Sequence, residues 1–112
     1  MERLVKGDVV VIPFPFSDLS ASKRRPALVL ANLQGNDILL CQITSQNSIE
    51  KTALPLRIED FTSGTLPSNS FIRPMRIFTA DKTLIIKKAG TISTKLMDKV
   101  INNIISVLKK ET

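Results

Sequence analysis

The stretch PALVLANLQGNDILLCQIT, residues 26–44, holds two apolar segments separated by a tight-turn composition. The segments Pro26–Asn32 and Asp37–Thr44 are rich in aliphatic residues, and Gln34-Gly35-Asn36 between them is typical of a hairpin turn. Neither segment alternates apolar with polar residues, as a strand with one wet face would. The sequence therefore predicts a β-hairpin that is buried on both faces.

Four further segments have the composition of short strands: Asp8–Phe16, Leu54–Ile58, Phe71–Phe78 and Thr83–Lys87. In the first of them, Pro13 and Pro15 limit the strand to an edge or to a bent end of the sheet, because proline has no N–H for the ladder. Turn-forming residues place breaks at Ser17–Lys23, Gln46–Thr52 and Thr62–Ser70.

The tail from Ser93 to Lys110 follows a different pattern. Its apolar residues recur with a period of about 3.6, which predicts an amphipathic helix capped by Ser93 or Thr94. The wide apolar stripe is expected to pack on the sheet, and part of it could also serve a subunit interface. Together the elements predict a mainly β fold with a C-terminal helix, a small barrel of mostly antiparallel strands, in one domain spanning residues 1–112.

The amino-acid composition excludes several classes of catalytic and metal site. The chain has 112 residues and no His, which excludes histidine triads and histidine-ligated zinc. A single Cys excludes an intramolecular disulfide and a cysteine metal cage, and favours a reduced, intracellular protein. The N-terminus lacks the plan of a secretory signal, and no apolar run approaches the ~20 residues that span a bilayer. We expect a soluble protein without a membrane partner.

The net charge of +6 is concentrated in the second half of the chain. Residues 1–60 contain seven basic and seven acidic residues, whereas residues 61–112 contain nine basic and three acidic ones. This surplus favours a nucleic acid or another polyanion as partner.

The densest basic cluster is Lys23-Arg24-Arg25-Pro26, where the small polar segment Ser17–Ser22 meets a buried strand. Lys23 and Arg24 fit either a solvated surface or contacts to phosphates. Arg25 lies at the mouth of a strand with its backbone restricted by Pro26, so it can present a planar charged fork to a phosphate. The Ser17–Ser22 segment has the composition of a movable flap over a site.

Two other clusters have polar groups suited to RNA. Thr44, Ser45 and Gln46 follow a strand end, where hydroxyls and amides either bind phosphates and bases or make ordinary turn contacts. Arg73 and Arg76 stand in a stretch, residues 61–80, that contains no acidic residue and includes Phe71 and Phe78. Basic residues beside aromatic rings suit single-stranded nucleic acid, although phenylalanines in strands usually belong to the core.

In this order, the clusters resemble the MazF/PemK family of toxins from type II toxin–antitoxin systems. Four stretches carry the resemblance: Gly7-Asp8-Val9, Arg25-Pro26-Ala27-Leu28-Val29-Leu30, Ile43-Thr44-Ser45 and Phe78-Thr79-Ala80-Asp81. It extends over nearly the whole chain and implies an SH3-like barrel with a terminal helix, usually assembled as a homodimer.

The resemblance also implies an activity, namely sequence-specific, metal-independent cleavage of single-stranded RNA to a 2′,3′-cyclic phosphate and a 5′-hydroxyl. The family's active-site Arg falls on Arg25, and its active-site Thr or Ser falls on Thr44. Arg25 would stabilise the charge of the transition state and could also donate a proton to the leaving oxygen. No cofactor and no metal are expected. The acid that some members carry in the flap has no counterpart, since the corresponding position is near Ser20, so the general base is left unassigned.

The resemblance further implies a cytoplasmic toxin that is neutralised by a small antitoxin with an acidic tail, and DNA binding only within that complex. On charge grounds, Lys23, Arg24, Ser45, Gln46, Arg73 and Arg76 are the expected RNA contacts. Two alternatives stay open: a gyrase-binding toxin of the same fold, which the absence of Trp disfavours, and a nucleic-acid-binding barrel without catalysis.

Overall fold

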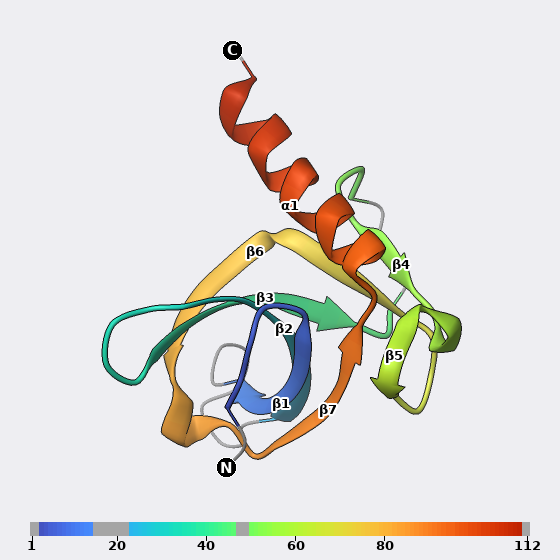
Figure 1. Ribbon diagram of the computed structural model, residues 1–112. Helices are drawn as coiled ribbons and strands as arrows, with labels where there is room; N and C mark the ends of the chain where they lie inside the picture. Colours follow the sequence, from blue (N-terminus) through green and yellow to red (C-terminus); the bar gives the residue numbers. More distant parts are fainter. Residues whose placement is uncertain (1–2, 15–22, 47–49, 111–112) are drawn as a thin grey trace.

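Seven strands form one antiparallel sheet in the computed structural model of the protein, which describes residues 3–14, 23–46 and 50–110. The sheet has the order β4-β6-β3-β2-β1-β7-β5 and curls into a half-barrel (Figure 1). The strands are β1 (Asp8–Phe14), β2 (Lys23–Asn32), β3 (Asp37–Thr44), β4 (Leu54–Leu56), β5 (Phe61–Gly64), β6 (Ser70–Asp81) and β7 (Lys87–Ile92). Two short 3-10 helices cover Ile58–Asp60 and Lys82–Leu84.

The predicted hairpin β2–β3 is confirmed, and both of its faces are buried. Alternate residues of β2 belong to different apolar clusters, with Leu28 in one and its neighbours Ala27 and Val29 in the other. The first cluster lies under the terminal helix, and the second is closed by Leu4 and Ile85. This two-sided burial accounts for the continuous apolar character of the hairpin sequence.

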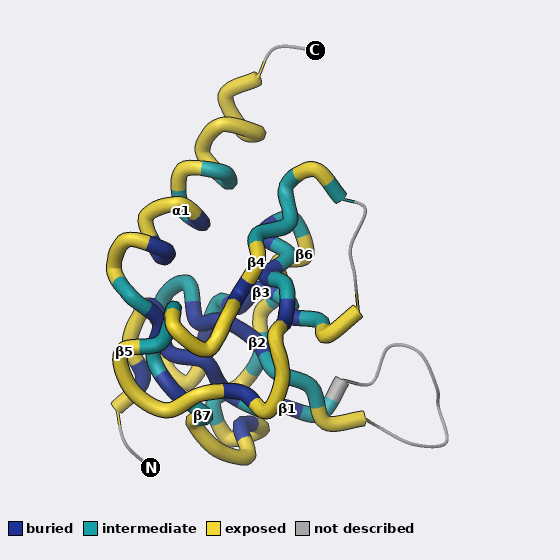
Figure 2. Tube along the Cα trace, turned by 90° about the vertical axis from the view of Figure 1, so that its right-hand side faces the viewer, coloured by how far each residue is buried: buried dark blue, intermediate teal, exposed yellow. Residues whose placement is uncertain are grey.

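The terminal helix α1 (Thr94–Lys109) is also confirmed, with Ser93 as its N-cap. The Ser93 hydroxyl accepts a hydrogen bond from the backbone N–H of Leu96 at 3.2 Å. The first half of α1 packs on the sheet, where Val100 is fully buried. The second half projects away from the sheet, and Leu108 is 79% exposed (Figures 1 and 2).

Pro13 fits a bent end of the sheet, because β1 lies inside it, between β2 and β7. Its pairing with β7 runs from Asp8 to Val11 and stops before Pro13. An edge position for this strand is therefore wrong, and Pro15 and the flap Ser17–Ser22 lie outside the described residues.

The expected strand Thr83–Lys87 is wrong, because Lys82–Leu84 is a 3-10 helix and β7 begins at Lys87. The predicted break at residues 62–70 also contains part of a strand, β5, which pairs with β7. Both differences arise near the same edge of the sheet, where apolar and polar residues alternate only weakly along the sequence.

Asp8 fastens the N-terminal segment and β7 to the start of β1. Its carboxylate is fully buried and accepts hydrogen bonds from the Val5 backbone N–H and the Thr91 hydroxyl, each at 2.8 Å. The Lys88 Nζ lies 3.4 Å from the same carboxylate. The Gly7-Asp8 motif therefore has a structural role in this chain.

None of the helices within residues 3–14, 23–46 and 50–110 is long and apolar enough to cross a membrane.

Candidate functional site

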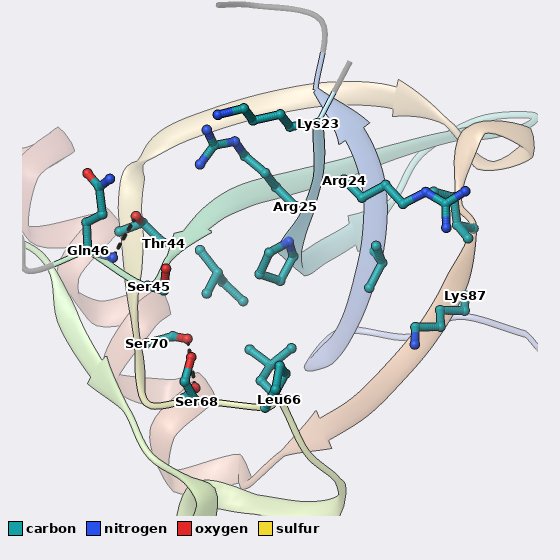
Figure 3. A pocket seen from close by; sticks show the side chains of 15 residues that line it. Lys23, Arg24, Arg25, Thr44, Ser45, Gln46, Leu66, Ser68, Ser70 and Lys87 are labelled. Atoms are coloured by element: carbon teal, nitrogen blue, oxygen red, sulfur yellow. Dashed lines mark hydrogen bonds between the residues drawn. The ribbon is translucent and has the colours of Figure 1, made fainter. Parts of the chain in front are cut away.

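A cavity of about 640 Å³ opens at one end of the half-barrel, where β2 begins and β3 ends. Val11 of β1, the start of β6, the start of β7 and the segment between β5 and β6 complete its wall (Figure 3). The antiparallel topology explains this meeting, because the start of one strand and the end of its neighbour share the same end of a sheet.

The first three residues of β2 present positive charge to this cavity. Lys23 and Arg24 are exposed and Arg25 is half-buried, and all three line the cavity. Successive strand residues point to opposite sides, so Lys23 and Arg25 extend together while Arg24 points toward Lys87 (Figure 3). Arg25 pairs with Ile12 of β1, which places its side chain at the mouth of a buried ladder.

Thr44 reaches the same cavity from the end of β3. The paired register of β2 and β3 ends at Ala27 and Gln42, so Arg25 and Thr44 each lie two residues beyond the same end of the ladder. Both line the cavity together with Ser45 and Gln46, and the four side chains appear in Figure 3. The Thr44 hydroxyl accepts a hydrogen bond from the Gln46 backbone N–H at 3.2 Å.

The wall is strongly cationic. Four of the residues that line the cavity carry positive charge: Lys23, Arg24, Arg25 and Lys87. None of the described lining residues has a carboxylate. Opposing hydroxyls come from Ser68 and Ser70, and the Ser70 hydroxyl donates to the Ser68 carbonyl at 3.1 Å. Such a wall suits a ligand with several negative charges and hydrogen-bond acceptors, as a phosphodiester chain has.

Sequence reasoning missed several residues of this wall. Lys87 reaches the cavity because it pairs with Val11 of β1. Leu66, Pro67, Ser68 and Ser70 reach it because β6 begins beside Thr44. No local motif marks these positions, since they depend on pairings between distant segments. The basic surplus of residues 61–112 was the one signal that included Lys87.

Two expected RNA contacts lie outside the cavity wall. Arg73 does not line the cavity, and its guanidinium binds Glu50 and Gln42 instead. Arg76 is exposed on β6 and does not line the cavity either. The stretch around them is free of acidic residues in sequence, but folding brings the Glu50 carboxylate against Arg73.

The Arg73 guanidinium lowers the pKa of the Glu50 carboxyl below its ordinary value, chiefly by hydrogen bonding. Burial acts in the opposite direction, and the charges of Arg73 and Arg76 add to the lowering. Glu50 is therefore ionised at neutral pH.

Metal ligands do not gather anywhere in the described part of the chain, in which no three Asp, Glu or Cys side chains are placed to share an ion. Burial raises the pKa of the Cys41 thiol to about 12, so this thiol is neutral at physiological pH.

The chain matches the family model for the PemK-like, MazF-like toxin of type II toxin–antitoxin systems over residues 5–108. None of the curated protein sequences compared with it matches. Among solved structures, it is similar to a mycobacterial endoribonuclease in complex with its cognate antitoxin, with a TM-score of 0.73 and 16% identity, covering 100% of this chain and 99% of that one.

Two further solved structures have nearly the same similarity. The Mycobacterium tuberculosis toxin MazF-mt6 gives a TM-score of 0.72 at 14% identity, covering 94% of this chain and 99% of that one. A MazE–MazF structure from Deinococcus radiodurans gives 0.72 at 17% identity, covering 99% and 100%. At these identities the similarity establishes the fold.

Proposed function

The chain belongs to the PemK-like, MazF-like toxin family of type II toxin–antitoxin systems, and on that premise we propose that it is a sequence-specific endoribonuclease for single-stranded RNA. The observation that carries this proposal is the placement of Arg25 and Thr44 at one ladder end inside a cation-lined cavity. The products are a 2′,3′-cyclic phosphate and a 5′-hydroxyl.

The reaction uses the substrate's own nucleophile. The ribose 2′-oxygen forms a bond to phosphorus while the bond from phosphorus to the 5′-oxygen breaks, so the 2′-hydroxyl loses a proton and the 5′-oxygen gains one. Because nucleophile and phosphorus belong to one molecule, positioning supplies much of the rate enhancement. No side-chain nucleophile and no metal ion are required by this scheme.

Arg25 and Thr44 are the proposed catalytic residues. Negative charge builds up on the phosphate oxygens in the transition state, and a guanidinium can bind two of them with parallel hydrogen bonds. The Thr44 hydroxyl orients a phosphate oxygen or the attacking 2′-hydroxyl. Charge stabilisation is the role we assign to Arg25, because a guanidinium is a poor proton donor.

The remaining polar side chains of the wall bind the RNA strand on either side of the reacting phosphate. Lys23, Ser45 and Gln46 surround Arg25 and Thr44, whereas Arg24 and Lys87 extend over the other side of the cavity (Figure 3). This distribution supports contacts to more than one phosphate. It also supports neutralisation by an antitoxin with an acidic tail, since such a tail presents the same charge as RNA.

A homodimer acting in the cytoplasm completes the proposal. The apolar stripe of α1 supports a subunit interface, because Ile105, Val107 and Leu108 stay exposed on its projecting half. Such a stripe on a free monomer would be left in contact with water.

The proposal is tested by incubating the purified protein with a long single-stranded RNA in excess chelator and mapping the ends. We expect cuts at a short defined sequence, which Arg25→Ala and Thr44→Ala abolish or slow by roughly a hundredfold or more. The matched control Lys109→Ala, on the far end of α1, should cleave like the unmodified protein. Protection of RNA without cuts would indicate a binding barrel, and neither effect would indicate a protein target such as gyrase.

A further inference from the structure

The guanidinium of Arg73 joins two parts of the chain that lie on either side of Thr44. Its Nη1 donates to Gln42 Oε1 at 2.7 Å, and its Nε donates to Glu50 Oε1 at 2.9 Å. Its Nη2 also pairs with the Glu50 carboxylate. We call this set of contacts the Arg73 bridge. It connects β3, two residues before Thr44, with the chain four residues after Gln46.

We propose that Arg73 is a positioning residue, because the Arg73 bridge holds the segment that carries Thr44 in the geometry needed for RNA cleavage. This inference rests on the proposed function. It replaces the direct phosphate contact that the sequence predicts for Arg73.

The strand register places the bridge next to the site. Gln42 and Thr44 share one face of β3, and Arg73 is the register partner of Gln42 on β6. Beyond Arg73 the pairing skips to Ile77, and the skipped segment begins with Pro74, which has no N–H for a ladder bond. Gln42 and Arg73 are therefore the first of three regular pairs, which end at Thr44 and Phe71.

The charge of Arg73 is already compensated. The Arg73 and Glu50 side chains are 22% and 27% exposed, so solvent and salt screen their pairing less than that of a fully exposed pair. Glu50 is ionised, and three donor nitrogens of Arg73 are engaged by Glu50 and Gln42. A phosphate that approached Arg73 would have to compete with a carboxylate held in place.

The far side of the bridge is fastened independently of Arg73. The backbone N–H of Ala53 donates to the Glu50 carbonyl at 3.2 Å, and the Asn103 side chain of α1 donates to the Thr52 carbonyl at 3.1 Å. Glu50 therefore belongs to a segment, residues 50–53, that is hydrogen-bonded to the terminal helix. Through its contacts with Arg73, this segment supports the end of β3.

The first test measures backbone order without RNA, using the full chain labelled with ¹⁵N. In Arg73→Met, the order parameters of Ser45 and Gln46 should fall from the rigid range near ~0.85 to below ~0.6. The isosteric variant Glu50→Gln should produce a fall in the same direction and replaces Arg73→Met if that variant does not fold. Arg76→Gln, three residues along the same strand, is the matched control and should leave these values unchanged.

The second test separates kcat from KM in RNA cleavage. Arg73→Met and Glu50→Gln should each lower kcat roughly tenfold to a hundredfold with KM nearly unchanged, because both displace Thr44 without removing a substrate contact. The double variant should be no slower than the slower single one, since both changes break the same bridge. Arg73→Lys should restore part of kcat, because lysine keeps the charge but lacks the planar fork.

A direct contact between Arg73 and a phosphate predicts a different result for Glu50→Gln, namely tighter RNA binding. Removing the carboxylate would then free Arg73 and strengthen RNA binding, while Arg73→Met would reduce the salt slope of binding by ~0.7. Either result, or unchanged order parameters in both bridge variants, would overturn the inference. If the unmodified protein does not cleave RNA, the proposed function fails, while the order parameters of Ser45 and Gln46 still decide whether the bridge exists.

Discussion

The cationic wall of the cavity predicts a specific salt dependence for RNA binding. Four basic side chains line the cavity, and each one that neutralises a phosphate of a single strand contributes a slope of ~0.7 to the dependence of log affinity on log salt. Four contacts therefore give a slope of ~2.8. Between 50 and 200 mM salt, the affinity should fall roughly 50-fold.

Lys87→Gln tests this count at the residue that sequence reasoning missed. One contact fewer reduces the slope to ~2.1, so the same change in salt should weaken binding only roughly 18-fold. Lys109→Gln is the matched control, because it removes the same charge from the projecting end of α1, away from the cavity. Its slope should equal that of the unmodified protein.

Fluorescence anisotropy with a 2′-O-methylated single strand is the suitable assay, because such a strand binds without offering the internal nucleophile. Titrations at several salt concentrations give the slope directly. A slope near zero, or an equal loss of slope in Lys87→Gln and Lys109→Gln, would refute the assignment of the cavity as the RNA site.

Three further predictions concern the fold that holds the site. Asp8→Ala removes a buried carboxylate that accepts two hydrogen bonds and pairs with Lys88, so it should lower the free energy of unfolding in urea by about 3 kcal/mol, whereas the exposed control Asp98→Ala should change it little. Gly64→Ala should lower the free energy of unfolding more than Gly35→Ala does, although both glycines have φ of 63°. The reason is that a Cβ at Gly64 would lie 2.1 Å from a carbonyl oxygen, whereas one at Gly35 has no neighbour within 4 Å. Equal losses of stability would contradict this. Cys41 should resist alkylation at pH 8 until the protein unfolds, and rapid labelling of the native protein would show that its thiol is not buried as described.

The parts of the fold that the sequence predicts well are those with strong periodicity. The hairpin β2–β3 is continuous in apolar residues because both of its faces are covered, and the helix has a clear 3.6-residue pattern with a serine cap. The edge strand β5 and its neighbour β7 carry no such pattern. Their close approach requires small residues, since a Cβ at Gly90 would lie 2.5 Å from the Ser63 carbonyl oxygen, and glycines do not signal a strand.

The misplaced strand has a physical cause as well. Thr83–Lys87 is apolar and alternates only weakly, which favours a strand, yet Leu84 is 53% exposed and Lys82–Leu84 forms a 3-10 helix. Apolar residues are common on protein surfaces, so a short alternation of this kind does not determine a strand.

The residues of the candidate site also differ in how well the sequence predicts them. The sequence places Arg25 and Thr44 at strand ends of one hairpin, and antiparallel pairing brings those ends together. It does not predict that Lys87 joins them or that Glu50 meets Arg73, because these contacts depend on pairings of segments far apart along the chain. An acid-free stretch of sequence is therefore no guide to which of its arginines are available to a ligand.

The most direct test of the account is the mass of the RNA fragments that the protein produces in excess chelator. We predict that each 5′ fragment ends in a 2′,3′-cyclic phosphate, lighter by one water than the linear phosphate, that each 3′ fragment begins with a 5′-hydroxyl, and that Arg25→Ala yields neither. Fragments with a 3′-hydroxyl and a 5′-phosphate, or normal cleavage by Arg25→Ala, would contradict attack by the 2′-hydroxyl at a phosphate held by Arg25.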